Sequence, residues 1–523
     1  MTQTLKKRVY GEFSPENPSM NNNRQIDILL VVSPANARAP YMPYYYLYLA
    51  GYLEKHGFTV EISNPHEVRF EDNVACILRD VHRFQPRFVG LAVFVTDYDV
   101  VVDLAGRIRR EYNGTIMAGN AHASISPEDF LFENSPFDLV VRGEGELTVR
   151  EILETYQSQG NNHRIKGIAY RQDGRLVQTQ NRELMDLNEC GMPAYHKINM
   201  AWYAQPIKVI IRRLATIGAV IYIGRGCPFQ CTFCASNSVW QANDRVPGSP
   251  VIRKRPMSHV IEDLRILQEH YGFDFFYILD DTFGIAEQDI IDFCSAYRES
   301  GLKMLWAAET RVRCIQKEYI VRLLNESGCI QLDFGVETGS ERLLKVIKKH
   351  NSVEEIIRAF DLCRTHRIRT FANILLNLPT ETDEDLAATM RLLTRIRPTY
   401  VSVGVTQPYP GTEIFRNLAQ PVARKEYRQL SRLLPPEKFR LSSHRKDLHK
   451  LLFSWQLRYG IDTPVEISLF QADWRYWSHL WHSPHRLRYL VFLVQDNALM
   501  PIRFLKTISH FFWSRRGGRS PEL

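Results

Sequence analysis

The chain has 523 residues, of which 45% are hydrophobic and 24% are charged, and this is enough for two or three hydrophobic cores. Nine cysteines, three of them within eight positions, argue against a secreted disulfide framework and favour a reducing compartment. We find neither an export signal at the start nor an apolar run of the roughly 18 residues that a membrane span requires, so we expect a cytoplasmic protein that is soluble or peripheral to a membrane.

The net charge of +8 comes from one part of the chain. Residues 421–523 contain 18 Lys and Arg against 8 Asp and Glu, which leaves residues 1–420 with a net charge of −2. A basic region of this kind suits nucleic acid, anionic lipid or an acidic substrate, but it is more often a solvated surface. We therefore expect no nucleic-acid partner.

Residues 1–24 are polar and predict a disordered leader. Short apolar runs and amphipathic stretches then alternate through residues 25–160, and this alternation predicts an α/β domain with a parallel sheet covered by helices. The expected strands are 26–32, 59–62, 88–94, 115–118 and 139–142, and the expected helices include 45–56 and 101–112.

Ligands of such a sheet bind beyond the carboxyl ends of its strands. Glycine and small polar residues follow those ends here, where they let a flat ligand approach the backbone and offer hydrogen bonds. Each loop taken alone also fits an ordinary tight turn. The candidate ligand-binding residues are Ser33, Thr96, Gly119, Asn120, His122, Ser124, Gly143, Glu144 and Gly145.

Residues 161–206 form a predicted linker with a hairpin near 172–174, and a second alternating series occupies residues 207–415. Six strand and helix units predict a partial (β/α)6 barrel with its active site at the carboxyl ends of the strands. Residues 416–523 lose this rhythm and predict a helical, aromatic and basic cap. The expected strands are 219–223, 275–279, 304–308, 330–334, 370–376 and 400–405, and the expected helices are 258–271, 287–300, 317–327, 340–348, 353–366 and 383–395.

Three cysteines directly follow the first strand of the second series. Cys227, Cys231 and Cys234 have the spacing C-x3-C-x2-C, and three thiolates on one loop can hold three irons of a 4Fe-4S cluster while the fourth iron stays open. Zinc is the alternative, but a closed zinc site needs a fourth ligand, and no Cys or His stands nearby at the usual spacing. The motif therefore predicts an iron-sulfur cluster.

This segment resembles the signature of the radical S-adenosylmethionine (SAM) superfamily, with Phe233 at its aromatic position. The resemblance implies that the open iron binds SAM and that the reduced cluster splits it to a 5′-deoxyadenosyl radical. Acidic and glycine-rich strand ends that resemble the family follow in order, although Thr380 replaces a glycine of the usual Pro-Gly-Glu-Thr. The SAM contacts that the resemblance implies are Phe233, Asp280, Asp281, Glu309, Arg311, Gly335 and Glu337.

The first domain resembles the cobalamin-binding domain that precedes such barrels in methylases and cyclases. Residues 119–123, Gly-Asn-Ala-His-Ala, stand where the family has Gly-Gly-Pro-His-Ala, and residues 142–146, Arg-Gly-Glu-Gly-Glu, match closely. The Asp-x-His-x-x-Gly motif of other cobalamin proteins is absent, so we expect no histidine ligand to cobalt of that type. The resemblance implies that one SAM methylates cobalt and that a second supplies the radical.

The leading hypothesis is a cobalamin-dependent radical SAM enzyme that methylates an unactivated carbon of a small molecule, lipid or tetrapyrrole. Oxidative cyclisation or rearrangement with the same cofactors is the nearest alternative. We rank tRNA methylthiolation low because the first domain has only Cys76, and a non-enzymatic cobalamin or redox sensor would not need an open iron. An electron donor such as flavodoxin or ferredoxin is expected, and no single residue is assigned as the catalytic group.

The end of the chain mixes aromatic, apolar and basic residues in segments 473–482 and 486–513. This composition fits an interfacial surface or a lid over an apolar substrate. A helical cap that packs its aromatic residues inward is at least as well supported.

Overall fold

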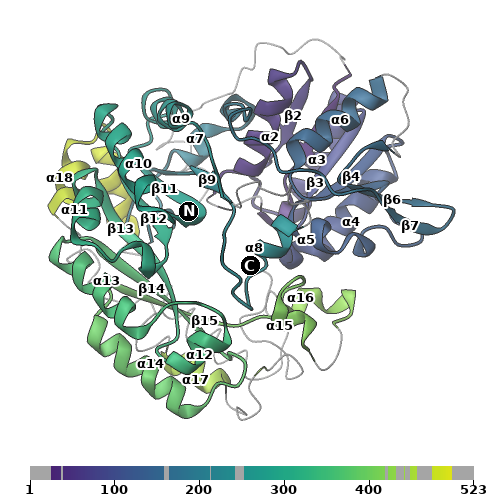
Figure 1. Cartoon of the computed structure of the whole chain (residues 1–523). Coiled ribbons are helices and arrows are strands. Elements are labelled where there is room, and N and C mark those ends of the chain that lie inside the picture. Colours follow the sequence, from purple (N-terminus) through teal and green to yellow (C-terminus); the bar gives the residue numbers. More distant parts are fainter. Residues whose placement is uncertain are drawn as a thin grey trace.

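The structure is a computed structural model that describes residues 25–36, 39, 41–157, 164–212, 214–241, 252–418, 422–430, 441, 448–455 and 474–496. Figure 1 shows two lobes, the first built on a sheet of the amino-terminal segments and the second on a curved sheet with helices outside it. The predicted leader and residues 497–513 of the tail lie outside the described residues.

The first lobe is a seven-stranded sheet in the order β2-β1-β3-β4-β5-β6-β7. Its first five strands are parallel, and the β6-β7 hairpin, which comes from the predicted linker, continues the sheet antiparallel. The α/β prediction with a parallel sheet is confirmed. The strands are β1 (Ile28–Val31), β2 (Val60–Ser63), β3 (Phe88–Ala92), β4 (Thr115–Gly119), β5 (Leu139–Val141), β6 (Ile168–Gln172) and β7 (Arg175–Gln178).

Helices cover both faces of this sheet, as the alternation of side chains along a strand requires. Ile28 and Leu30 of β1 belong to the core that includes α2 and α6, whereas Leu29 and Val31 belong to the core that includes α3 and α4. Helix α3 was not predicted, although its buried Val74, Ile77 and Val81 recur at helical spacing. The helices are α2 (Tyr44–Lys55), α3 (Phe70–Phe84), α4 (Tyr98–Arg109), α5 (Asn120–Ile125) and α6 (Gly145–Gln157).

The second lobe is a six-stranded parallel sheet in the order β15-β14-β13-β12-β11-β8, and its described end strands β8 and β15 do not pair with each other. The predicted partial barrel is therefore confirmed. Two of its strands run past their expected ends and are irregular there, β11 between Ile278 and Phe283 and β13 between Gly335 and Glu337. The strands are β8 (Gly218–Ile221), β11 (Phe275–Phe283), β12 (Leu305–Thr310), β13 (Cys329–Glu337), β14 (Arg369–Leu376) and β15 (Tyr400–Val405).

Six helices connect these strands and lie on the outside of the barrel (Figure 1). Two begin at capping boxes, in which Ser352 and Glu355 or Thr382 and Asp385 satisfy each other's backbone amides. The helices are α9 (Met257–Glu269), α10 (Glu287–Glu299), α11 (Glu318–Glu326), α12 (Glu341–Val346), α13 (Val353–Thr365) and α14 (Asp383–Ile396).

The two lobes share one hydrophobic core, which runs from α2 and α6 through the connecting segment with α7 (Met200–Tyr203) into the barrel. A buried carboxylate, Asp263 of α9, joins the same three parts of the chain. It accepts hydrogen bonds from Tyr48 of α2 at 3.0 Å, from Tyr195 of the connecting segment at 2.6 Å and from Arg255 at 2.9 Å. The lobes are therefore held together by both apolar packing and buried polar contacts.

The described segments after the barrel pack at two different places. Tyr427 and Leu430 of α16 (Tyr427–Leu430) are buried in the core of the first lobe. Helix α18 (Trp474–His482) and the helical residues 486–496 pack instead against the amino ends of the barrel strands, where Tyr476 bonds the carbonyl oxygen of Ala215 and Tyr489 bonds Asp274. Short helices α15 (Glu413–Arg416) and α17 (Leu448–Trp455) complete the described part.

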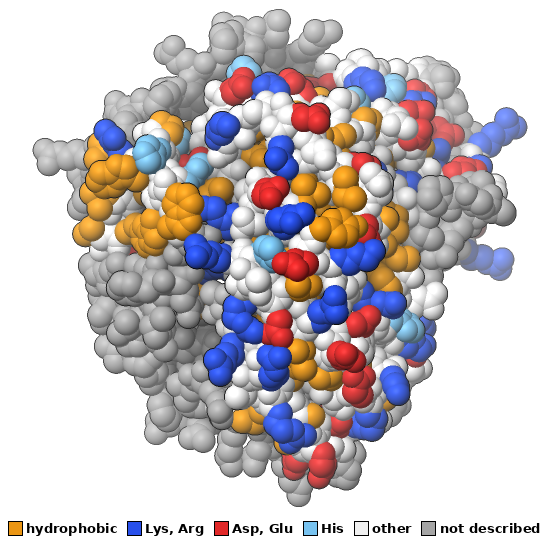
Figure 2. All heavy atoms as spheres, turned by 60° about the vertical axis from the view of Figure 1, so that its left-hand side comes forward, with side chains coloured by type: hydrophobic (Ala, Val, Ile, Leu, Met, Phe, Trp, Pro, Cys, Tyr) orange, Lys and Arg blue, Asp and Glu red, His pale blue; other side chains and the backbone are white. Residues whose placement is uncertain are grey.

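Residues 474–496 do not form a lid over an apolar substrate at the barrel mouth. The amino ends of the strands lie opposite the cysteine loop, so these residues cannot cover the barrel mouth. They bury Tyr476 and Tyr489 and leave Trp474 and Trp481 exposed, and Figure 2 shows hydrophobic side chains grouped beside histidine and basic side chains on one face. No helix among the described residues has both the length and the apolar character needed to cross a bilayer.

Candidate functional site

The cysteine loop begins in a short antiparallel pair between β9 (Gly224–Arg225) and β10 (Arg253–Lys254) and ends at α8 (Ser236–Gln241). The thiols of Cys227, Cys231 and Cys234 form no disulfide and are all partly exposed. Burial raises the pKa of the Cys234 thiol to about 11, and the neighbouring Cys231 and Cys227 act in the same direction. The three predicted ligands therefore lie together on one loop.

These thiols suit a cluster better than a single ion. Within the described ranges, no group of three or more His, Cys, Asp or Glu side chains converges on one ion position. A cube of four irons binds each thiolate at a different iron, so its ligands need not converge. Arg311 places a guanidinium nitrogen 3.5 Å from the Cys231 sulfur, so a positive charge lies beside this predicted ligand.

Two predicted SAM contacts support the cysteine loop itself. Asp280 accepts hydrogen bonds from the amides of Ile223 at 2.8 Å and Gly224 at 3.0 Å. Asp281 accepts from the amide of Gly226 at 3.0 Å, from Ser236 at 2.6 Å and from the Trp240 indole at 3.0 Å. The irregular stretch of β11 thus aims Asp280 at the segment before the cysteines and Asp281 at the segments on both sides of them.

Glu309, at the end of β12, lies in a different environment. Burial is the main cause that raises the pKa of its carboxyl to about 7, and the nearby Asp333 adds to the shift. Asp333 is fully buried in the barrel, where Tyr277 donates to it at 3.0 Å and Gln331 at 2.8 Å. A carboxyl of this kind can donate or accept a proton near neutral pH.

The end of β13 carries a buried ion pair. Lys349 lies 2.6 Å from Glu337, and its ammonium group is 5.7 Å from the centre of the Phe233 ring in the cysteine loop. A Cβ atom at Gly335 would lie 2.5 Å from both charged groups, so a larger residue there would force the ends of these side chains to move. The pair links the predicted SAM contacts Gly335, Glu337 and Phe233.

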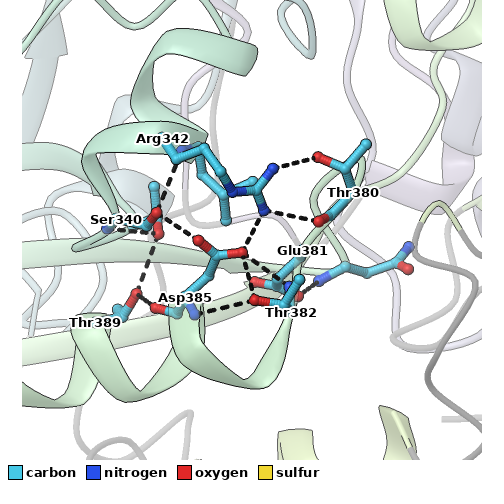
Figure 3. A network of polar contacts seen from close by, with 10 residues as sticks. Ser340, Arg342, Thr380, Glu381, Thr382, Asp385 and Thr389 are labelled. Carbon is cyan, nitrogen blue, oxygen red and sulfur yellow. Dashed lines mark hydrogen bonds and ion pairs between the residues drawn. The ribbon is translucent and has the colours of Figure 1, made fainter.

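Thr380 replaces the glycine of the family's Pro-Gly-Glu-Thr, and a polar network holds the loop that contains it (Figure 3). Thr380 has a φ of 64°, a left-handed conformation that favours glycine. Arg342 donates to its hydroxyl at 2.9 Å and to its carbonyl oxygen at 2.8 Å, and also bonds Asp385. The threonine therefore keeps the backbone shape of a glycine position, and its hydroxyl adds one hydrogen bond that glycine could not make.

A cavity of about 580 Å³ lies between the two lobes. One wall is the carboxyl edge of the first sheet, with Gly119, Asn120, Gly143, Glu144 and Gly145, and the opposite wall belongs to the barrel mouth. Its volume falls within the usual range of roughly 300 to 1,000 Å³ for ligand sites. The residues that line the barrel side include Tyr222, Gly224, Arg225, Trp240, Leu279, Asp280, Asp281 and Glu309.

Four predicted residues of the first lobe do not line this cavity. Ser33 is buried, and Thr96 is exposed on a short 3-10 helix. His122 is buried with its Nε2 atom 3.0 Å from Asp129, which also bonds Tyr427 of α16, and Ser124 accepts the amide of Gly143 at 3.0 Å. His122 and Ser124 thus support the loops behind the cavity wall.

The sequence did not predict the partners of Glu144 and Glu146, the two acidic residues after β5. Arg225 reaches Glu144 at 2.9 Å and Glu146 at 2.7 Å, and Arg253 reaches Glu144 at 2.8 Å. Arg225 stands two positions before Cys227 in the sequence, but nothing in its spacing indicates a partner 79 to 81 residues away.

Comparison with known proteins agrees with this architecture. Residues 35–153 match the B12 binding domain and residues 221–393 match the radical SAM superfamily. An uncharacterized methyltransferase of Pyrococcus horikoshii is 27% identical over 76% of this chain and 86% of its own length. An anaerobic magnesium-protoporphyrin IX monomethyl ester cyclase of Cereibacter sphaeroides is 24% identical over 83% of this chain and 68% of its own.

The fold also matches a solved structure. A radical SAM methyltransferase of Kitasatospora setae, TsrM, solved with cobalamin and a 4Fe-4S cluster bound, has a TM-score of 0.59 and 19% identity over 75% of this chain and 74% of that one. Both resemblances drawn from the sequence motifs are confirmed.

Proposed function

Because this chain is a radical SAM enzyme with a B12 binding domain ahead of the barrel, we propose that it methylates an unactivated carbon of a small-molecule, lipid or tetrapyrrole substrate. Its cofactors are a 4Fe-4S cluster, SAM and cobalamin. When bound, the reduced cluster yields a carbon-centred radical from SAM, and cobalamin supplies a transferable methyl group.

The proposal assigns the cluster to Cys227, Cys231 and Cys234. Asp281 holds the loop on both sides of these cysteines, and the Arg311 guanidinium supplies a positive charge beside Cys231. SAM would then lie against the barrel mouth, where Glu309 lines the cavity. Cobalamin would lie against Gly119, Gly143 and Gly145, whose lack of side chains admits a flat ring.

The single observation that carries the proposal is that one cavity is lined both by the carboxyl edge of the first sheet and by the barrel mouth. A methyl carrier on the first sheet and a radical source at the barrel mouth would both face the same cavity. Substrate bound there would be within reach of both cofactors.

Methyl transfer and oxidative cyclisation make different products from the same cofactors. We would incubate the reconstituted enzyme with SAM that carries a CD3 group, a tetrapyrrole methyl ester or lipid extract, and a reductant, and analyse the products by mass spectrometry. A product that contains CD3 supports methylation. A product that has lost hydrogen and contains no label would assign the chain to cyclisation instead.

The electron donor is proposed to be a flavodoxin or a ferredoxin. Each would be supplied in reduced form in place of a chemical reductant, and 5′-deoxyadenosine would be measured. Formation of this product with either donor supports the assignment, whereas its formation only with the chemical reductant would contradict it.

We also propose peripheral membrane contact through the face of α18 and residues 486–496. Seven of their apolar side chains are exposed: Trp474, Trp477, Trp481, Leu487, Leu490, Val491 and Val494. Residues 474–496 contain three arginines and three histidines but one acid, Asp496, which is buried and paired with Lys208 at 2.7 Å. Exposed tryptophan beside basic groups and no exposed acid fits an anionic lipid surface.

Vesicle sedimentation tests this contact. The protein should bind phosphatidylglycerol vesicles better than phosphatidylcholine vesicles, and Trp474→Ser with Trp481→Ser should weaken binding by about tenfold or more. Val68→Ser removes a similarly exposed apolar side chain from the first lobe and serves as control. Equal binding to both lipids, or unchanged binding of the variant, would contradict the contact.

A further inference from the structure

The ion pairs between the lobes are concentrated at one point on the cavity wall. Glu144 accepts hydrogen bonds from Arg253 at 2.8 and 2.9 Å, from Arg225 at 2.9 Å and from the amide of Met185 at 2.9 Å. Glu146 accepts from the other nitrogen of Arg225 at 2.7 Å. The first lobe, the connecting segment and the β9-β10 pair therefore meet around one carboxylate.

These contacts are shielded from water. The side chains of Glu144 and Glu146 are 6% and 7% exposed, and those of Arg225 and Arg253 are 19% and 9% exposed. The two arginines hold the pKa of Glu144 below its usual range in spite of burial, so the carboxylate is charged. A planar guanidinium that bonds two carboxylates restricts direction as well as distance.

The position of the pairs along the chain is what connects them to the cofactors. Glu144 stands between Gly143 and Gly145 on the first wall of the cavity, and Arg225 stands two residues before Cys227. One side chain therefore joins the proposed cobalamin loop to the proposed cluster loop. Glu144 accepts four hydrogen bonds from protein groups, so its carboxylate is held in place on the cavity wall.

We propose that Arg225, Glu144, Glu146 and Arg253 form an interlobe clamp that sets the spacing and orientation of the two cofactor loops. This inference rests on the proposed function and gives these residues a positioning role. Transfer between two bound groups is sensitive to their separation, since a displacement of about 1 Å can lower a rate by about 100-fold. SAM would be cleaved at the cluster loop of the barrel, so this reaction should depend less on the clamp than transfer between the two loops does.

The first test uses the protein without cofactors. Glu144→Gln combined with Glu146→Gln keeps the shape of both side chains and removes their charges. Hydrogen exchange of backbone amides should become faster by about tenfold in residues 143–149 and 224–236 and stay unchanged in the outer helices of the barrel. Glu326→Gln, at the end of α11, breaks a surface pair with Arg298 of α10, and this matched control should change neither segment.

The second test uses protein reconstituted with iron, sulfide and hydroxocobalamin and then reduced with an excess of a chemical reductant, with SAM as the only probe. The double variant should retain its iron and corrin, and its yield of S-adenosylhomocysteine relative to 5′-deoxyadenosine should fall by about 10- to 100-fold. Arg225→Lys keeps the charge but cannot bond both carboxylates in the same way, so it should give a smaller fall.

An unchanged product ratio, or a parallel loss of both products, would show that the pairs only support the fold and would overturn the clamp. Unchanged hydrogen exchange would overturn it as well. If the wild-type protein forms neither product, the proposed function fails, and the hydrogen exchange result still decides whether the ion pairs hold the two loops.

Discussion

Asp280 and Asp281 show how single residues prepare the cysteine loop. Burial raises the pKa of the Asp280 carboxyl to about 7, while the amides of Ile223 and Gly224 oppose that shift by bonding its charged form. Asp281 bonds groups on both sides of the cysteines. Each carboxylate thus fixes backbone positions that a cluster would require.

Replacing Asp281 tests this role. Asp281→Asn has one oxygen in place of two and cannot accept hydrogen bonds from Gly226, Ser236 and Trp240 together. We expect cluster occupancy to fall by about tenfold or more, as for other supporting contacts of metal ligands. Iron and sulfide analysis after anaerobic reconstitution measures the cluster occupancy. Asp292→Asn, on the outer helix α10, is the control. Full occupancy in Asp281→Asn would contradict the role.

Thr380, in contrast, is a residue that adopts an unfavourable backbone conformation, with a positive φ. A β-branched residue with positive φ costs about 1 to 2 kcal/mol, and part of this is offset by the bonds from Arg342. Thr380→Gly should therefore raise the free energy of unfolding by about 0.5 to 1 kcal/mol in urea titration. Thr394→Gly, inside α14, should lower the free energy of unfolding. A free energy of unfolding for Thr380→Gly below that of the wild-type protein would refute the strain at Thr380.

At the scale of elements, the tail helices act at the end of the barrel remote from the cysteines. Asp274, just before β11, accepts hydrogen bonds from Tyr489 at 2.6 Å and Ser483 at 2.9 Å. The Tyr489 hydroxyl in turn accepts the amide of Ile217 at 2.7 Å. One buried carboxyl therefore couples two barrel strands to residues more than 200 positions later.

This carboxyl makes stability depend on pH. Burial raises the pKa of Asp274 from 3.8 to about 7, against the hydrogen bonds from Tyr489 and Ser483. The folded state therefore favours the neutral carboxyl, and its contribution to stability is complete below pH 4 and is lost as the pH rises through 7.

Between pH 5 and 8 the free energy of unfolding of the wild-type protein should fall relative to that of Asp274→Asn, on the order of a few kcal/mol. Urea titrations across this range give the two profiles. Parallel profiles would show that Asp274 does not titrate in the folded protein over this range.

The sequence predicted most of these elements. Strand β15 has the expected bounds, and the barrel helices agree within a few residues, because buried alternation and capping residues are local signals. Helix α3 was missed although its pattern is local. The attachment of α16 to the first lobe could not be predicted, because the contact of Tyr427 with Asp129 spans 298 residues and has no local signal.

At the scale of the whole molecule, the function depends on how two lobes face one another. The cysteine motif and the glycine loops each predicted one cofactor, but neither predicted the shared cavity. The partners of Glu144 could not be predicted either, since a carboxylate at a loop end fits a ligand or an arginine equally well. The assignments to SAM and cobalamin remain predictions, while the geometry adds Arg225, Arg253, Trp240 and Lys349 to the site.

Anaerobic reconstitution of wild-type protein and Cys231→Ala with iron, sulfide and hydroxocobalamin tests the central claim most directly. After reduction with SAM present, spectra report the cluster and the corrin, and chromatography reports 5′-deoxyadenosine and S-adenosylhomocysteine. We predict that wild-type protein retains both cofactors and forms both products, and that Cys231→Ala loses the cluster and SAM cleavage. Continued cleavage by Cys231→Ala would contradict the cluster assignment, and 5′-deoxyadenosine from wild-type protein that retains no corrin would contradict the role of the first lobe.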